Sequence, residues 1–120
     1  MPRLYARTLF IAFTLLFSAP ASASDSVENV ILVLDASGSM WSRVDGKSKI
    51  EIARNSVAGL VSEWKPGIRL GLIAYGHRRR GDCGDIEMVL PVGKVDAARF
   101  TGVVNGISPK GKTPLSAAVR

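Results

Sequence analysis

The sequence has few of the residues that small domains use for cross-links or metal clusters. Its 120 residues include one cysteine, Cys83, and one histidine, His77. One cysteine excludes an internal disulfide framework, and no Cys/His cluster is present to build a zinc site. Glycine and proline, at 12 and 6 residues, are too scarce for a collagen-like repeat, and an apolar share of 47% excludes a mostly disordered chain. The length allows one domain at most.

Long apolar runs are also scarce, and the longest lies near the start. Residues 8–17 are apolar at eight of ten positions, follow a segment containing Arg3 and Arg7, and precede Ala21-Ser22-Ala23. This pattern is typical of a cleavable secretory signal peptide. About ten apolar residues fall short of the roughly 20 that a membrane-spanning helix needs. We therefore expect a signal peptide over residues 1–23 and an exported protein, periplasmic or extracellular, with cell-surface anchoring as an open alternative.

Removal of this signal changes the charge and the chemical surroundings of the chain. The remaining 97 residues carry 14 basic and 10 acidic side chains, a net charge of +4. Residues 24–29 then form a short lead-in to a domain over residues 30–120. Cys83 has no partner cysteine within the chain, so it is either a free thiol or pairs with a cysteine of another chain.

The domain alternates between strand and helix patterns. Residues 30–34 form an apolar run without alternation, which indicates a strand buried on both faces. Ser48 and Glu51 have the spacing of a capping box, and apolar residues recur with a helical period from there to Trp64. Further patterns predict a strand over 68–75, an edge strand over 86–92, a helix over 97–107 after Asp96, and another helix from Leu115 onward.

This order of elements predicts an α/β fold. We expect the first two strands to be parallel neighbours, connected through the first helix by a right-handed crossover, and the third strand to follow by a hairpin. Pro91 favours an edge position for that third strand. The last helical pattern has no stop signal before Arg120. We therefore expect the N-terminal half of a larger domain, with three strands, two helices and the start of a third helix.

Oxygen-bearing side chains follow the first strand directly. Asp35, Ser37 and Ser39 lie at the point where that strand ends, which in doubly wound α/β folds is the edge where ligands bind. One carboxylate and two hydroxyls suit a hard cation such as Mg²⁺. By spacing alone, clusters of Asp and Ser more often form turns and helix caps than metal sites.

The segment Asp35-Ala36-Ser37-Gly38-Ser39 resembles the D-x-S-x-S motif of the metal-ion-dependent adhesion site (MIDAS) in von Willebrand factor type A (VWA) domains. The resemblance covers residues 28–120. It continues in order through the first helix and the next two strands to residues 111–115, which resemble the loop that supplies the threonine of that site, here Thr113. Residues 75–87 are similar to a bacterial exported branch of the family. The resemblance implies a Rossmann-like doubly wound sheet.

For function, the resemblance implies a metal site formed by Asp35, Ser37, Ser39 and Thr113. In the family the hydroxyls usually contact Mg²⁺ directly and the carboxylates often act through water; Mn²⁺ and Ca²⁺ are alternative ions here. A further family aspartate follows the fourth strand, beyond Arg120. The implied activity is capture of a protein partner through its acidic residue, without enzymatic chemistry. The competing interpretation is a non-catalytic structural module of an envelope assembly, in which the metal braces the loops.

A nucleotide-binding motif competes for Thr113. Residues 106–113 satisfy the G-x-x-x-x-G-K-[ST] pattern of a phosphate-binding loop. Such a loop follows a buried strand, whereas residues 96–107 have a helical pattern. Pro109 removes a backbone N–H from the cradle, and Pro114 lies where the next helix should already be under way. We therefore keep nucleotide binding only as a remote alternative.

Four side chains are candidate contacts for a partner: Trp41, Arg78, Arg79 and Arg80. Three consecutive arginines favour a partner with an acidic protein surface or anionic lipid headgroups. The alternative is a solvated surface loop without a partner. Trp41 either faces a partner or packs beside the serines. No aromatic residues interleave with the arginines, so nucleic acid is not an expected partner. We expect His77 to be a solvated loop residue, and we assign any membrane association to a region outside this sequence.

Overall fold

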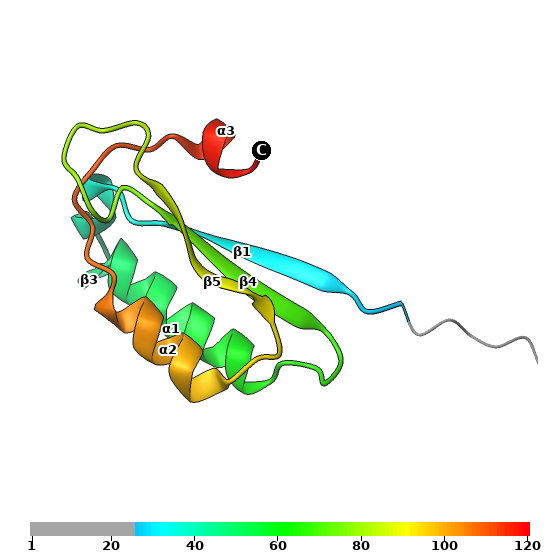
Figure 1. Ribbon diagram of the computed structural model, residues 1–120. Helices are drawn as coiled ribbons and strands as arrows, with labels where there is room; N and C mark the ends of the chain where they lie inside the picture. Colours follow the sequence, from blue (N-terminus) through cyan, green and yellow to red (C-terminus); the bar gives the residue numbers. More distant parts are fainter. Residues whose placement is uncertain (1–25) are drawn as a thin grey trace, which may run out of the picture.

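The computed structural model describes residues 26–120, so the predicted signal peptide lies outside the described residues (Figure 1). The main sheet has three strands, β1 (Asn29–Asp35), β4 (Arg69–Tyr75) and β5 (Ile86–Gly93), in the order β1-β4-β5. β1 and β4 run parallel, with Asp35 opposite Tyr75, and β5 runs antiparallel to β4. The predicted α/β fold, the parallel pair and the edge position of the third strand are confirmed.

Two helices cover one face of this sheet. α1 (Lys49–Ser62) and α2 (Ala97–Gly106) lie side by side, and the short α3 (Leu115–Ala118) lies on the other side of the sheet (Figure 1). The core fills the space between the two long helices and the sheet, because both helices turn their apolar stripe inward. Its central side chains are Leu34, Val57, Val61, Leu72, Phe100 and Val104.

The prediction that the first strand is buried on both faces is wrong for one face. Leu34 points to the helices and is buried, whereas Ile31, on the opposite face of β1, is 47% exposed. Met88 on β5 is exposed to the same extent. Successive side chains of a strand point to opposite faces, and α1 and α2 both lie on one of them. In the described part of the chain the second face is therefore open over much of its length.

A small hairpin that the sequence patterns did not predict precedes α1. After the turn η1 (Gly38–Trp41), strands β2 (Arg43–Val44) and β3 (Lys47–Ser48) pair antiparallel. The turn residues Asp45 and Gly46 both have positive φ, 47° and 82°. An Asp-Gly dipeptide is a strong signal for this kind of two-residue turn, so the signal was present in the sequence.

The capping box predicted at the start of α1 is half formed, and it leads to a stability prediction. The backbone N–H of Glu51 donates to Ser48 Oγ at 3.3 Å. Ser48→Ala is expected to lower the free energy of unfolding by about 1 kcal/mol, because this N–H loses its partner at the helix start. Urea denaturation measures the change. Ser56→Ala, in the exposed middle of α1, is the control and is expected to change stability by less than about 0.5 kcal/mol.

Among residues 26–120, none of the helices has the length and apolar character needed to cross a membrane.

Candidate metal centre

The predicted metal ligands Asp35, Ser37 and Ser39 come together where β1 ends. Asp35 Oδ1 accepts a hydrogen bond from the Ser37 backbone N–H at 2.8 Å. The hydroxyls of Ser37 and Ser39 lie 3.0 Å apart and share a hydrogen bond. Ser37 is only 1% exposed, whereas Ser39 is exposed. The turn after the strand thus brings the two hydroxyls together and sets the Asp35 carboxylate against the Ser37 backbone N–H.

Residues 109–113 form the second wall of this site. The Gly38 N–H donates to the Gly111 carbonyl at 2.9 Å, and Ser37 and Gly111 form a parallel β-bridge. The Gly111 N–H in turn donates to the Gly76 carbonyl at 2.7 Å. The loops after β1 and β4 are thus tied to the segment after α2 by backbone hydrogen bonds.

Thr113 follows this bridge by two residues. Its side chain is exposed, and within residues 26–120 no hydrogen bond joins it to Asp35, Ser37 or Ser39. The structure therefore links Asp35, Ser37 and Ser39 by hydrogen bonds and places the fourth predicted ligand on the adjoining segment.

Tyr75 borders the Asp35 carboxylate from the neighbouring strand. The tyrosine is 2% exposed, and its register partner across the parallel pair is Asp35. Burial raises the pKa of Tyr75 to about 12, and the negative charge of Asp35 adds to the rise. The phenol is therefore neutral at every physiological pH and remains a hydrogen-bond donor beside the carboxylate. Sequence patterns identified Tyr75 only as the end of a strand.

The donor set fits a hard divalent cation. Asp35, Ser37 and Ser39 present only oxygen atoms, the ligand type that Mg²⁺ and Ca²⁺ prefer. The two hydroxyls lie in mutual contact, and the backbone N–H of Ser37 orients the carboxylate. Asp35, Ser37, Ser39 and Thr113 are thus the residues that would hold the ion. Among the described residues no three His, Cys, Asp or Glu side chains form a group that could hold a metal ion, here or at another place, so this site would depend on its hydroxyls.

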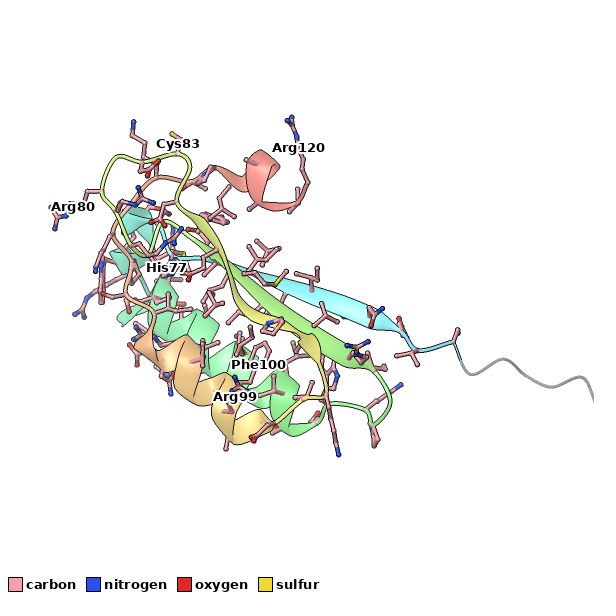
Figure 2. The ribbon with its side chains drawn as sticks, viewed as in Figure 1. His77, Arg80, Cys83, Arg99, Phe100 and Arg120 are labelled. Atoms are coloured by element: carbon pink, nitrogen blue, oxygen red, sulfur yellow. The ribbon has the colours of Figure 1, made fainter. Side chains whose placement is uncertain are left out.

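The candidate partner contacts differ in whether their polar groups are already bonded within the protein. Trp41 is 52% exposed, but its indole N–H donates to the Pro109 carbonyl at 3.0 Å, which ties η1 to the second wall of the site. Arg79 lies 3.2 Å from Asp82 in an exposed ion pair. Arg80 projects from the outer end of the loop between β4 and β5 (Figure 2).

Arg78 has a structural partner, Asp85, which the sequence patterns did not identify. Asp85 is fully buried and accepts from the Arg78 and Arg79 backbone N–H groups at 2.7 and 2.8 Å and from Arg78 Nε at 2.7 Å. Burial by itself raises the pKa of this carboxyl, but the Arg79 N–H and the Arg78 side chain and N–H lower it more, to about 2. Asp85 is thus an ionised anchor that holds the loop between β4 and β5.

The expectation that His77 is solvated is wrong. Its side chain is 11% exposed, and Nε2 lies 2.8 Å from Glu87 Oε2 on β5. Asp85 holds the backbone of the two residues that follow His77, because the Arg78 and Arg79 N–H groups both donate to its Oδ2. Proximity in space to Glu87, ten residues away, was not visible in the sequence.

The segment with the phosphate-loop pattern has a different structural context. α2 precedes it and ends at Gly106, and Pro109 is buried with its carbonyl bonded to the Trp41 indole. A phosphate-binding loop instead follows a strand and leads directly into a helix. The helix predicted before this motif is confirmed.

The arrangement defines a class of protein: an α/β domain with a mixed sheet and a site of hydroxyls and one carboxylate at the carboxyl end of its parallel strands. The family model described as the von Willebrand factor type A domain matches residues 30–120. The chain therefore belongs to the von Willebrand factor type A domain family.

Several known proteins resemble the chain. It is 30% identical over 116 residues to YwmC of Bacillus subtilis (strain 168), covering 85% of this chain and 51% of that protein. It is 25% identical over 128 residues to YwmD of the same strain, covering 99% of this chain and 57% of that protein. The chain thus spans about half the length of these relatives. A mutant of the PilB minor pilin from Streptococcus sanguinis shares the fold, with a TM-score of 0.54 and 18% identity over 79% of this chain and 25% of the pilin.

Proposed function

We propose that this domain is an exported protein-binding module that captures a partner carboxylate through Mg²⁺ held at Asp35, Ser37, Ser39 and Thr113. The observation that carries the proposal is the contact between the Ser37 and Ser39 hydroxyls beside the Asp35 carboxylate, at the carboxyl end of β1. Membership of the VWA family supports a protein-interaction role. No bond in the partner is broken, so we propose no enzymatic activity.

The chain's own residues account for the orientation of the site. The Ser37 N–H fixes one carboxylate oxygen of Asp35, and the parallel bridge to Gly111 fixes the turn that carries the serines. A bound Mg²⁺ with mostly neutral hydroxyl ligands supplies an electrophilic position for an acidic side chain of the partner. Exposed Trp41 and Arg80 lie on the loops around this edge and form the proposed rim contacts.

Metal titration tests the site itself. Asp35→Asn keeps an oxygen that accepts from the Ser37 N–H but removes the negative charge. It is expected to weaken Mg²⁺ binding by about 10- to 100-fold in calorimetric titration, the usual effect of losing a carboxylate that orients or neutralises a metal site. Asp45→Asn is the matched control, because Asp45 lies in the exposed turn between β2 and β3 and asparagine tolerates its positive φ. Equal affinities of the two variants would contradict the assignment of Asp35.

The carboxylate-capture step needs a separate test. Peptides selected from a random display library on the full-length protein in Mg²⁺, and released with EDTA, are expected to share an Asp or Glu. Conversion of that acid to its amide is expected to abolish binding, and Asp35→Asn is expected to reduce recovery to background. Peptides that remain bound in EDTA, or that bind without an acid, would contradict the mechanism.

A structural role in an envelope assembly is the second candidate. The likeness to a minor pilin supports it at the level of the fold, as do the backbone hydrogen bonds that join the site to residues 110 and 111. In this case Mg²⁺ would raise the thermal stability of the protein, while the selected peptides would show no acidic residue in common.

A further inference from the structure

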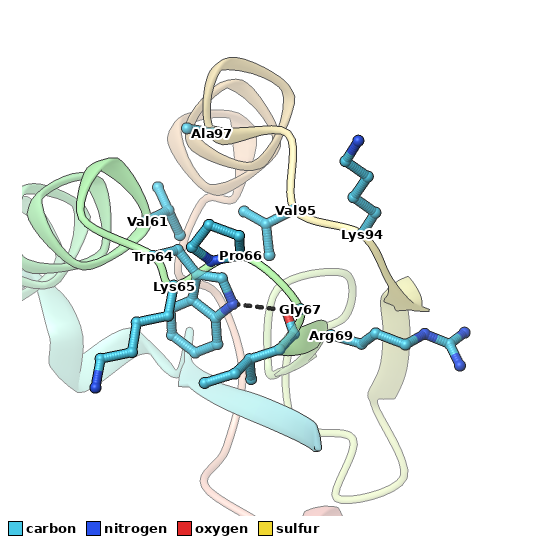
Figure 3. Close-up of a pocket in the computed structure, with 10 residues that line it drawn as sticks. Val61, Trp64, Lys65, Pro66, Gly67, Arg69, Lys94, Val95 and Ala97 are labelled. Atoms are coloured by element: carbon cyan, nitrogen blue, oxygen red, sulfur yellow. Dashed lines mark hydrogen bonds between the residues drawn. The ribbon is translucent and has the colours of Figure 1, made fainter. Parts of the chain in front are cut away.

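A second concave site lies at the end of the sheet opposite the metal centre. It is a cavity of about 400 Å³ between the last turn of α1, the loop into β4, and the segment that joins β5 to α2 (Figure 3). Arg69, the first residue of β4, lines it, whereas Asp35 is the last residue of the parallel strand β1. The cavity and the metal centre are thus separated by the length of these strands.

The inner surface of the cavity is apolar and ordered. Val61, Trp64, Pro66 and Val95 contribute side chains to it, and Figure 3 shows the Trp64 ring at its centre. The Trp64 indole N–H donates to the Ile68 carbonyl at 2.9 Å. The polar atom of the indole is therefore satisfied within the protein, and its ring offers apolar surface to a ligand.

Three cationic residues border this apolar surface, Arg69 and Lys94 on one side and Lys65 on the other (Figure 3). Lys65, Arg69 and Lys94 line the cavity with exposed side chains, and no acidic residue is among its described lining residues. Within residues 26–120 none of the three forms an ion pair. Arg69 Nη2 donates to the Val92 carbonyl on β5 at 2.9 Å, and Figure 3 shows Arg69 and Lys94 on the same side of the cavity, with their charged ends extended away from Trp64. The nearby Asp96 is engaged at the start of α2, where it accepts from the Arg99 N–H.

We propose that this cavity binds a small organic anion with an aromatic or branched apolar body and a single carboxylate. The body contacts Trp64 and Val95, and the carboxylate contacts Arg69 and Lys94. A volume of about 400 Å³ falls within the range of small-molecule sites, roughly 300–1,000 Å³. Three cations without an anionic partner provide the charge complementarity, and the apolar floor selects against inorganic anions. The proposal is independent of the metal-dependent function.

The two tryptophans of the chain provide the measurement. Trp64 lies in the cavity and Trp41 lies beside the metal centre, so each indole N–H signal in a ¹H–¹⁵N NMR spectrum reports on one site. The probe is 4-phenylbutyrate, titrated into the full-length protein, with the uncharged 4-phenylbutyramide as its matched control. The acid is expected to move the Trp64 signal saturably and to leave the Trp41 signal in place. The amide is expected to bind at least about tenfold more weakly, because it cannot form charge-assisted hydrogen bonds.

Two pairs of variants locate the binding. Ala97→Phe fills the cavity and is expected to abolish the shift, whereas Ala98→Phe, one residue further and exposed on α2, is expected to preserve it. Lys94→Gln is expected to weaken binding of the acid about tenfold but not binding of the amide, with Lys47→Gln on β3 as control. Lys94→Gln changes an exposed side chain, so it tests the proposal even if Ala97→Phe unfolds the protein.

Three results would overturn the proposal: no saturable shift of Trp64 at millimolar acid, equal affinity for acid and amide, or equal shifts of both indoles. Asp35→Asn is expected to leave the Trp64 titration unchanged. Failure of the metal site and failure of this cavity are therefore distinguishable.

Discussion

Gly76→Ala is expected to destabilise the protein by about 3 kcal/mol and to disrupt the metal centre. Gly76 follows β4 with φ of 72°, and a Cβ added there would lie 2.7 Å from the Lys112 carbonyl oxygen and 3.0 Å from Ser37 Cα. The left-handed backbone costs an L-residue roughly 1–2 kcal/mol, and overpacking against backbone atoms that cannot rotate away adds about 1–3 kcal/mol. The segment after Gly111 has to move away from the serines to make room.

Gly81→Ala is the matched control. Gly81 lies further along the same loop with nearly the same φ, 74°, but a Cβ there meets nothing within 4 Å. The Gly81→Ala variant is expected to lose only about 1 kcal/mol of unfolding free energy, from the left-handed backbone of an L-residue. Its Mg²⁺ affinity is expected to equal that of the wild type. Chemical denaturation and calorimetric Mg²⁺ titration of both variants measure the difference. Similar losses in the two variants would contradict the role given to close packing at Gly76.

Asp85→Asn is expected to lower the free energy of unfolding by about 3 kcal/mol. The buried carboxylate accepts three hydrogen bonds from Arg78 and Arg79, and the amide nitrogen of asparagine would point a donor at these donors. Removing one partner of a buried charged pair costs roughly 3–5 kcal/mol. The lower end applies because the Arg78 side chain is 39% exposed and regains water. Equilibrium urea denaturation provides the value.

Asp82→Asn is the control within the same loop. Asp82 is partly exposed, accepts from the Gly84 N–H and forms a surface ion pair with Arg79. Its replacement is expected to cost less than about 1 kcal/mol, the usual range for exposed pairs. If Asp82→Asn destabilises the protein as much as Asp85→Asn, burial of Asp85 is not the cause.

Asp85 also predicts a pH dependence with a definite sign. Its pKa is lowered from 3.8 to about 2 in the folded protein, so the folded state binds this proton less readily than the unfolded state. The contribution of Asp85 to stability is fully present above about pH 4 and is lost as the pH falls through about 2. The stability difference between wild type and Asp85→Asn is therefore expected to narrow over this window, measured by thermal unfolding at each pH. A constant difference would contradict an ionised Asp85.

Local patterns were sufficient for most of the fold. The strands around residues 30–34, 68–75 and 86–92, the helix start at Ser48 and the helix after Asp96 are confirmed within one or two residues. Such patterns arise from residues close together in the sequence, so they can be read from a single chain. The hairpin turn at Asp45-Gly46 also had a local signal. The family resemblance predicted the class of domain, and the matching family model confirms that class.

The sequence by itself determined the α/β order of elements and the oxygen chemistry of Asp35, Ser37 and Ser39. Only the tertiary structure decided which distant residues meet: Gly111 with Ser37, Asp85 with Arg78, His77 with Glu87, and Trp64 with Lys94 and Val95 around one cavity. These contacts join segments that are not local neighbours along a helix or strand. Their free energy depends on burial and on distance, which the path of the backbone sets and no local periodicity encodes.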